Sequence, residues 1–207
     1  LALAYLTSSL RREDFSVEII DGDAEKLSNQ DVVAHIIASD IQLVGITSLA
    51  RTIDDALEIA SEVKKHNPSI HICLGGQHAT YAAEDILLES IFVDSVVRGE
   101  GEETFAELAK QLALKKTLHG IEGIYYRDPS GIIQKNSDRR AIKNLDYLPL
   151  PARDVLEKLI NKGHNPVLSV LSSRGCYGTC IFCNASSFSR LGGGESWRGR
   201  SAKNVVD

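Results

Sequence analysis

Methionine is absent from the 207 residues, which begin with Leu1, and we therefore expect the sequence to be an internal part of a longer protein. Long apolar runs are absent as well. None reaches the ~18 residues needed to cross a bilayer, and no basic-then-apolar secretory signal opens the sequence. These absences exclude a membrane-spanning or secreted protein of the usual kind, and we expect a cytoplasmic one.

Blocks of basic residues are also missing. The formal net charge is −5, and acidic and basic residues are interspersed, so no basic stripe would attract a nucleic acid backbone. Nucleic acid is therefore a disfavoured partner. The contents of 43% apolar and 25% charged residues are typical of a globular protein, and they exclude disordered and fibrous classes.

Cysteine is scarce, and its positions are uneven. Cys176, Cys180 and Cys183 fall within one short segment, whereas Cys73 lies far upstream. A secreted scaffold would distribute an even number of cysteines through a smaller chain. The tight triplet therefore indicates metal or cluster chemistry, and we interpret Cys73 as a small buried strand residue.

The first part of the sequence, residues 1–116, alternates amphipathic helical stretches with short runs rich in Val and Ile. This alternation is typical of repeated βα units and predicts an α/β fold with a doubly wound parallel sheet. The expected strands are residues 15–20, 41–47, 70–74 and 95–97.

Helical spacing of apolar residues predicts the helices of this domain. Leu3, Leu6 and Leu10 predict a helix over residues 1–12, and Thr52 followed by Asp55 predicts a capping box for the next helix. The apolar faces of two later helices are Ile53, Ala56, Leu57, Ala60 and Val63, and Phe105, Leu108, Ala109 and Leu112.

A hairpin and a linker are expected over residues 117–166. Residues 121–126 and 132–135 flank Asp128-Pro129-Ser130-Gly131, whose Pro and Gly occupy favoured type I turn positions. The prolines within residues 148–151 exclude regular helix and strand. A further strand at residues 167–171 opens a second domain over residues 167–207, which is enough for about one βα unit.

The segment CYGTCIFC, from Cys176 to Cys183, has a cysteine spacing from which we expect three thiols to converge on one centre. Soft thiolates select zinc, copper(I) or iron-sulfur clusters. A structural zinc site ordinarily closes with a fourth Cys or His nearby, and none follows Cys183. Three cysteines on a four-iron cluster would leave one iron open to a substrate or cofactor. A zinc knuckle without its last ligand is the alternative.

This spacing, with the aromatic Phe182 directly before the third cysteine, resembles the radical S-adenosylmethionine (SAM) family. The resemblance implies that Cys176, Cys180 and Cys183 hold an oxygen-sensitive [4Fe-4S] cluster whose open iron chelates SAM, and that Phe182 lies against the adenine. It further implies an electron donor that drives SAM cleavage to a 5′-deoxyadenosyl radical. Residues 167–207 would then be the first βα unit of a partial (β/α) barrel.

A second glycine-rich element lies close behind the cysteines. Gly193-Gly194-Glu195 looks like the Gly-Gly-Glu element that holds SAM in this family, yet no helix and strand fit between it and Cys183. We interpret it as a flexible glycine loop. The segment from Trp197 to Asp207 instead resembles the start of the first barrel helix in cobalamin-dependent members, with Ser201 as its cap.

Loops that follow the predicted strands carry a related resemblance. Parallel sheets bind ligands beyond the carboxyl ends of their strands, where this sequence places three loops. The loops are Thr47-Ser48-Leu49-Ala50, Gly75-Gly76-Gln77-His78 and Arg98-Gly99-Glu100-Gly101-Glu102. Ahead of a radical SAM motif, their order resembles the flavodoxin-like cobalamin-binding domain, with Thr47, Ser48 and Leu49 at its SxL position and Gly75 and Gly76 at its GG position.

The DxHxxG element of that domain is not present, and we expect its first strand to be missing too. No axial His is therefore assigned, and we interpret His78 as a polar loop residue. Loss of a central strand predicts a poorly stable fragment with a gap in the sheet, or a re-paired sheet, because unpaired backbone groups are costly.

The resemblance implies an enzyme that uses SAM and cobalamin to methylate an unactivated carbon, or to catalyse a radical rearrangement or ring closure. The substrate, a small molecule or one of unknown class, is not identified, and we expect the fragment itself to be inactive. A radical SAM protein without corrinoid binding and a non-catalytic fragment are the alternatives. A methylthiotransferase is disfavoured because Cys73 alone cannot hold a second cluster.

Overall fold

The computed structural model describes residues 1–206, which form two compact units. One unit contains residues 20–137, and the other combines residues 1–19 with the segment from Asp138 onward. The domain boundaries expected after residues 116 and 166 stay a prediction. Within residues 1–206, no helix has the length and apolar character needed to span a bilayer.

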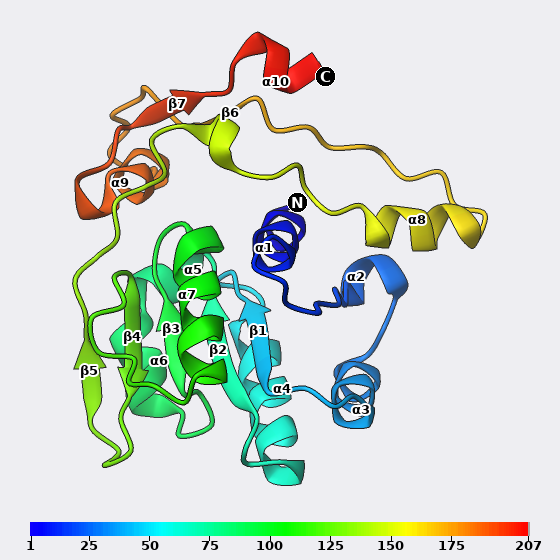
Figure 1. Cartoon of the computed structure of the whole chain (residues 1–207), viewed down its shortest axis with the longest axis vertical. Coiled ribbons are helices and arrows are strands. Elements are labelled where there is room, and N and C mark those ends of the chain that lie inside the picture. Colours follow the sequence, from blue (N-terminus) through cyan, green and yellow to red (C-terminus); the bar gives the residue numbers. More distant parts are fainter. Residues whose placement is uncertain (207) are drawn as a thin grey trace. The chain divides into compact units, whose positions relative to one another are not determined.

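A five-stranded sheet forms the centre of the unit at residues 20–137, with the strand order β1-β2-β3-β4-β5 (Figure 1). The strands are β1 (Leu43–Thr47), β2 (His71–Gly75), β3 (Ser95–Val97), β4 (Ile124–Arg127) and β5 (Ile133–Lys135). The first three run parallel, and β4 and β5 add an antiparallel hairpin beside β3. The three later parallel strands and the hairpin were predicted correctly. That the hairpin extends the same sheet was not predicted.

The strand predicted at residues 15–20 is wrong. This segment has no ladder partner, and its backbone groups bond locally instead: Phe15 N donates to Leu10 O, and Arg11 Nη2 donates to Val17 O. In the described part of the chain, β1 therefore pairs only with β2 and forms the edge of the sheet. The expected gap between two strands is therefore not observed, because residues 15–20 form no strand beside β1.

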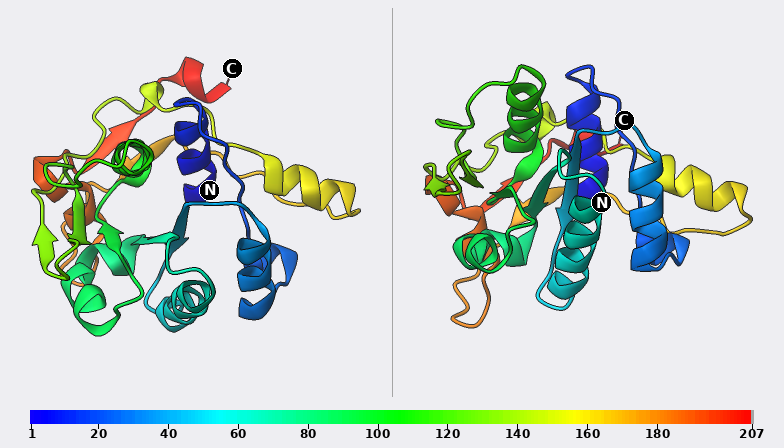
Figure 2. Two further views of the ribbon diagram at one scale, coloured as in Figure 1. Left: turned by 60° about the horizontal axis from the view of Figure 1, so that its bottom comes forward. Right: turned by 90° about the horizontal axis from the view of Figure 1, so that it is seen from below.

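Helices cover both faces of the sheet, as expected for a doubly wound fold. They are α2 (Gly22–Glu25), α3 (Asn29–Ala38), α4 (Ile53–His66), α5 (Gln77–Tyr81), α6 (Ala83–Glu89) and α7 (Gly101–Ala113). In Figure 1, α7 lies in front of the sheet and α4 and α6 lie behind it, and Figure 2 shows the same separation.

Side chains alternate along the strands between two buried clusters. In β2, Ile72 and Leu74 join α4 and α6 in one cluster, whereas Cys73 joins α7 in the other. Because successive strand residues point to opposite faces, a strand buried on both sides reads as a continuous apolar run. The α/β class predicted from these runs is confirmed.

The helix caps differ from the prediction. Thr52 makes no cap bond to α4; its Oγ1 instead accepts from Leu49 N at 3.0 Å. A capping box is present at α3, where Ser28 Oγ accepts from Asp31 N and the Asp31 carboxylate accepts from Ser28 N. The Thr52–Asp55 pattern failed because the loop after β1 competes for the hydroxyl.

The second unit is built from short elements. These are α1 (Ala2–Arg11), η1 (Leu145–Tyr147), α8 (Asp154–Asn161), β6 (Ser173–Gly175), α9 (Ala185–Ser189), η2 (Leu191–Gly193), β7 (Trp197–Gly199) and α10 (Ala202–Val206). The predicted helix at residues 1–12 is confirmed as α1. Its Tyr5 is buried with Leu145 and Leu148, and the guanidinium carbons of Arg174 and Arg200 each lie 5.3 Å from the Tyr5 ring centroid.

The strand predicted at residues 167–171 is also wrong. Val167, Leu168 and Val170 are exposed and belong to no ladder, and the strand before the cysteines is instead β6, paired with β7. An apolar run becomes a strand only where a neighbour satisfies its backbone groups. The predicted cap is confirmed, because Ser201 Oγ accepts from Asn204 N at 3.2 Å.

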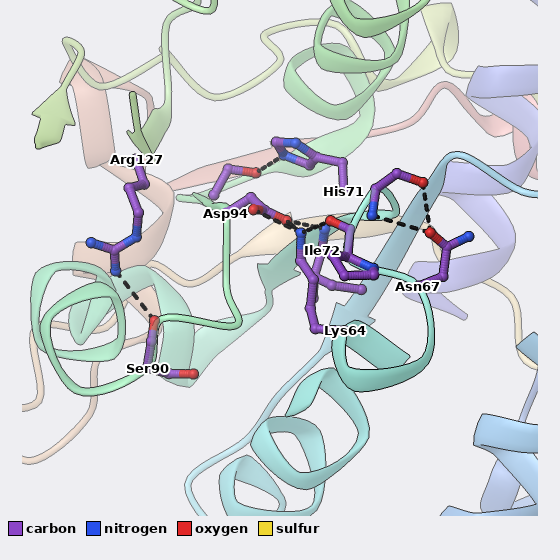
Figure 3. Close-up of polar contacts among 10 residues, drawn as sticks. Lys64, Asn67, His71, Ile72, Ser90, Asp94 and Arg127 are labelled. Carbon is purple, nitrogen blue, oxygen red and sulfur yellow. Dashed lines mark hydrogen bonds and ion pairs between the residues drawn. The ribbon is translucent and has the colours of Figure 1, made fainter. Parts of the chain in front are cut away.

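A polar network lies at the amino ends of β2 and β3 (Figure 3). The Asp94 carboxylate accepts from Ile72 N at 2.7 Å and lies 2.7 Å from Lys64 Nζ. Beside it, His71 Nε2 lies 2.8 Å from Ser95 Oγ. Burial lowers the pKa of His71 to about 4, because its effect is larger than that of the nearby Asp94 carboxylate, which raises the pKa. The imidazole is therefore neutral in the folded chain at neutral pH.

We predict that His71 makes stability fall with acidity. Its contribution is fully present above the unfolded pKa of 6.5, and it is lost by ~1.4 kcal/mol per pH unit as the pH falls toward about 4, because only the unfolded chain binds the proton. Urea unfolding at several pH values should show a shallower dependence for His71→Gln. The exposed His119→Gln variant is the control, and equal slopes for all three proteins would contradict the prediction.

Candidate functional site

The carboxyl ends of β1, β2 and β3 bring together the three loops singled out from the sequence. Because these strands are parallel, the loops that follow them emerge at one edge of the sheet. Thr47 ends β1 in register with Gly75, the last residue of β2. The two motifs at the SxL and GG positions are therefore direct neighbours.

Ser48 joins the first loop to the second. It is 1% exposed, and its N–H donates to Gly75 O at 2.9 Å, while its own carbonyl accepts from His78 N at 3.3 Å. Its Oγ also donates to Gly75 O, at 3.4 Å. The Ser48 side chain thus bonds within the protein. Leu49, with 45% exposure, is a large apolar residue of this loop that lies at the surface.

The paired glycines have different surroundings. Gly76 has a φ of +94°, and a Cβ there would lie 2.8 Å from both Ser48 O and Thr47 Oγ1. Gly75 has no positive φ, and a Cβ there would meet only Val97, at 3.8 Å and beyond. Gly76 therefore permits the contact between the loops, whereas Gly75 has room for a Cβ at ordinary van der Waals distance from Val97.

The third loop is attached through Thr80, a residue that sequence reasoning missed. Thr80 is fully buried; its Oγ1 donates to Gly76 O at 2.8 Å and accepts from Gly99 N at 3.0 Å. Arg98 Nη1 donates to the Thr80 carbonyl, and the Arg98 guanidinium lies over the Tyr125 ring. The only local signal was a hydroxyl four residues after a helix-starting glycine, a spacing that permits bonding to the i−4 carbonyl.

The cysteine loop lies in the other unit. Cys176, Cys180 and Cys183 are free and exposed, and Cys176 N donates to Ser196 O at 2.7 Å. A Cβ on Gly178 would lie 3.4 Å from the Cys176 sulfur and 3.6 Å from that of Cys180, so these two thiols gather around one glycine. Within residues 1–206, no three Cys, His, Asp or Glu side chains are close enough to hold a metal together.

The cysteine loop carries two aromatic side chains. Phe182, within the loop, is 89% exposed. Tyr177, which sequence reasoning did not single out, stacks on Trp197 with ring centroids 4.9 Å apart and planes at 22°. This pair links the cysteine loop to β7, the partner of the strand that precedes it.

The glycine segment that follows is a packed turn rather than the flexible loop expected. Gly192 and Gly193 adopt positive φ, and a Cβ on Gly192 would lie 2.5 Å from Arg139 O. A Cβ on Gly194 would lie 2.9 Å from that of Ala141. The interpretation failed because these glycines serve close backbone contact, which composition alone does not distinguish from freedom of movement.

Cys73 lies in β2 and is 2% exposed. Burial raises the pKa of its thiol to about 12, so it stays protonated at neutral pH. The interpretation of Cys73 as a buried strand residue is confirmed.

Comparisons with known proteins agree with this geometry. A family model described as B12 binding domain matches residues 1–109. An uncharacterized methyltransferase of Pyrococcus horikoshii is 38% identical over the whole chain, which spans 44% of that protein. The anaerobic magnesium-protoporphyrin IX monomethyl ester cyclase of Rubrivivax gelatinosus is 31% identical over 99% of the chain and 37% of its own length.

Solved structures point the same way. The cobalamin-dependent S-adenosylmethionine radical enzyme OxsB, solved with aqua-cobalamin and S-adenosylmethionine bound, matches with a TM-score of 0.80 and 26% identity. The match covers 99% of this chain and 27% of OxsB. The chain therefore spans less than half the length of each of these relatives.

We predict that the two glycines differ in their effect on folding. Gly76→Ala places a Cβ against Ser48 O in a backbone region that only glycine tolerates, and should lower the free energy of unfolding by about 1–3 kcal/mol. Gly75→Ala meets ordinary van der Waals distances and should change it by less than ~1 kcal/mol. Urea denaturation measures both, and equal losses would refute the assignment.

Proposed function

Because the chain belongs to the B12-binding domain family, we propose that the carboxyl edge of its sheet binds cobalamin in an enzyme that also uses SAM. The observation that carries this proposal is the arrangement of the glycine pair. Gly76 packs the second loop against the first, and beside them a Cβ on Gly75 would meet only Val97, at ordinary van der Waals distance.

The residues at this edge fit a large flat ligand. Because Gly75 carries no side chain, a corrin could approach its backbone closely, and the partly exposed Leu49 offers an apolar contact. We assign Thr47, Ser48, Leu49, Gly75 and Gly76 to this site. Ser48 and Gly76 would act by holding the loops in place, because both are already occupied by contacts within the protein.

The cysteine loop fits an iron-sulfur cluster by the chemistry of its donors. Three exposed thiols on one loop supply the soft ligands that such clusters require. We assign Cys176, Cys180 and Cys183 as the ligands, with Cys183 turning to join the two that already surround Gly178, and Phe182 as the residue beside the adenine of SAM. When bound, the reduced cluster would supply the electron that cleaves SAM.

The reaction class follows from the relatives rather than from a substrate pocket. A methyltransferase and a cyclase resemble this chain along nearly its whole length. We infer that the enzyme methylates or cyclises a small molecule of unknown identity, with a reducing electron donor as a partner. A reducing compartment, the cytoplasm, suits both the cluster and the free thiols.

We predict that the protein binds hydroxocobalamin at micromolar concentration and that Gly75→Val weakens this binding by at least about tenfold, because the side chain fills the open edge. Spectral titration under anaerobic conditions measures the affinity. Gly22→Val, which also meets ordinary contacts at 3.8 Å but lies in α2, is the matched control and should bind normally. If the wild-type protein does not bind hydroxocobalamin, the cobalamin proposal fails. The alternatives are then a radical SAM protein without corrinoid binding and a non-catalytic chain.

We predict that anaerobic reconstitution of the full-length protein with iron and sulfide gives a cluster of about four irons, lost when Cys176, Cys180 or Cys183 is replaced by Ala. Each replacement removes one of the only ligands that the loop supplies. Iron content and the visible charge-transfer absorption measure the loss, and Cys73→Ala is the control that should keep its cluster. Tight zinc binding without iron uptake would favour the zinc knuckle instead, and SAM cleavage would separate an enzyme from a non-catalytic chain.

A further inference from the structure

Thr80 occupies the point where the loops of the proposed cobalamin edge meet. We propose that Thr80 is a positioning residue, which fixes the loop at Arg98 and Gly99 relative to Gly76 so that the corrinoid meets a preformed edge. This inference rests on the proposed function, because it assumes that the corrinoid binds there.

The Thr80 hydroxyl makes hydrogen bonds to groups from two loops. Its Oγ1 donates to Gly76 O at 2.8 Å and accepts from Gly99 N at 3.0 Å. The same residue is 0% exposed, so water cannot replace either partner. A single hydroxyl therefore bridges the loop after β2 and the loop after β3.

The Thr80 backbone strengthens this bridge. Its N–H donates to Gly76 O at 3.0 Å, and its carbonyl accepts from Arg98 Nη1 at 2.7 Å. The Arg98 guanidinium carbon lies 4.6 Å from the Tyr125 ring centroid, which holds the arginine against β4. Thr80 thus links the third loop to α5 by both its main chain and its side chain.

The link continues to the first loop. Gly76 has no room for a Cβ beside Ser48 O and Thr47 Oγ1, and His78 N donates to Ser48 O. The contacts from Thr47 through Gly76 to Thr80 and Gly99 therefore form one connected series along the edge. Sites held by such supporting bonds lose less conformational freedom when a ligand binds.

Removal of the hydroxyl separates this role from general stability. Thr80→Val keeps the shape of the side chain but leaves Gly99 N–H without its acceptor, whereas Thr80→Ser keeps the bridge. Ser95→Ala is the matched control, because Ser95 is also fully buried and its hydroxyl bonds to His71 at the amino edge of the sheet. Both deletions remove one buried hydroxyl, but only one of them lies at the proposed corrinoid edge.

The experiment combines anaerobic hydroxocobalamin titration with hydrogen exchange of the ligand-free protein. Thr80→Val should weaken binding about tenfold and speed exchange of the Gly99 amide, Thr80→Ser should restore both, and Ser95→Ala should alter neither. If circular dichroism shows that the Val variant is unfolded, Thr80→Ala replaces it as the deletion of the hydroxyl.

The outcomes are distinguishable from those of the proposed function. Wild-type protein that does not bind hydroxocobalamin refutes the cobalamin site and this inference with it. Wild-type protein that binds, together with a Thr80→Val variant of equal affinity or unchanged Gly99 exchange, overturns the role of Thr80 alone. Equal weakening by Ser95→Ala also overturns it, because the effect would then be general destabilisation.

Discussion

The close approach of Gly76 to the Ser48 carbonyl is the contact on which the candidate site depends. It is possible because two parallel strands end in register and because Gly76, with a φ of +94°, has no Cβ, which would lie 2.8 Å from Ser48 O. Through it, the loop after β1 and the loop after β2 become one surface. The hydrogen bonds of Thr80 then extend that surface to the loop after β3.

The parallel sheet was largely predictable because its strands are buried on both faces and read as continuous apolar runs. β2 and β3 fall where these runs occur, and the hairpin follows its turn residues. Residues 15–20 and 167–171 are also rich in apolar residues but form no strand. Whether an apolar run joins a sheet depends on a partner for its backbone groups, and that partner is not encoded in the run itself.

The candidate site was predictable as a set of motifs but not as a set of roles. Glycine pairs and spaced cysteines are recognisable in the sequence. The sequence does not, however, distinguish Gly76, where a Cβ would clash with the first loop, from Gly75, where a Cβ would fit. Thr80 escaped notice because an isolated threonine in a short helix resembles many others. Its role is visible only in the folded structure, where the Gly99 N–H, 19 residues away in the sequence, donates to its hydroxyl.

The contrast between Cys73 and the other cysteines has a practical consequence for studying the folded chain. One thiol is enclosed between the sheet and α7, while the three of the cysteine loop lie at the surface. A thiol-directed label or oxidant therefore reacts with the cysteine loop alone in the folded chain, and the signal of the label reports on that loop. Accessibility of Cys73 to the same reagent would instead signal that the sheet has opened, so the four sulfurs act as two separate chemical reporters.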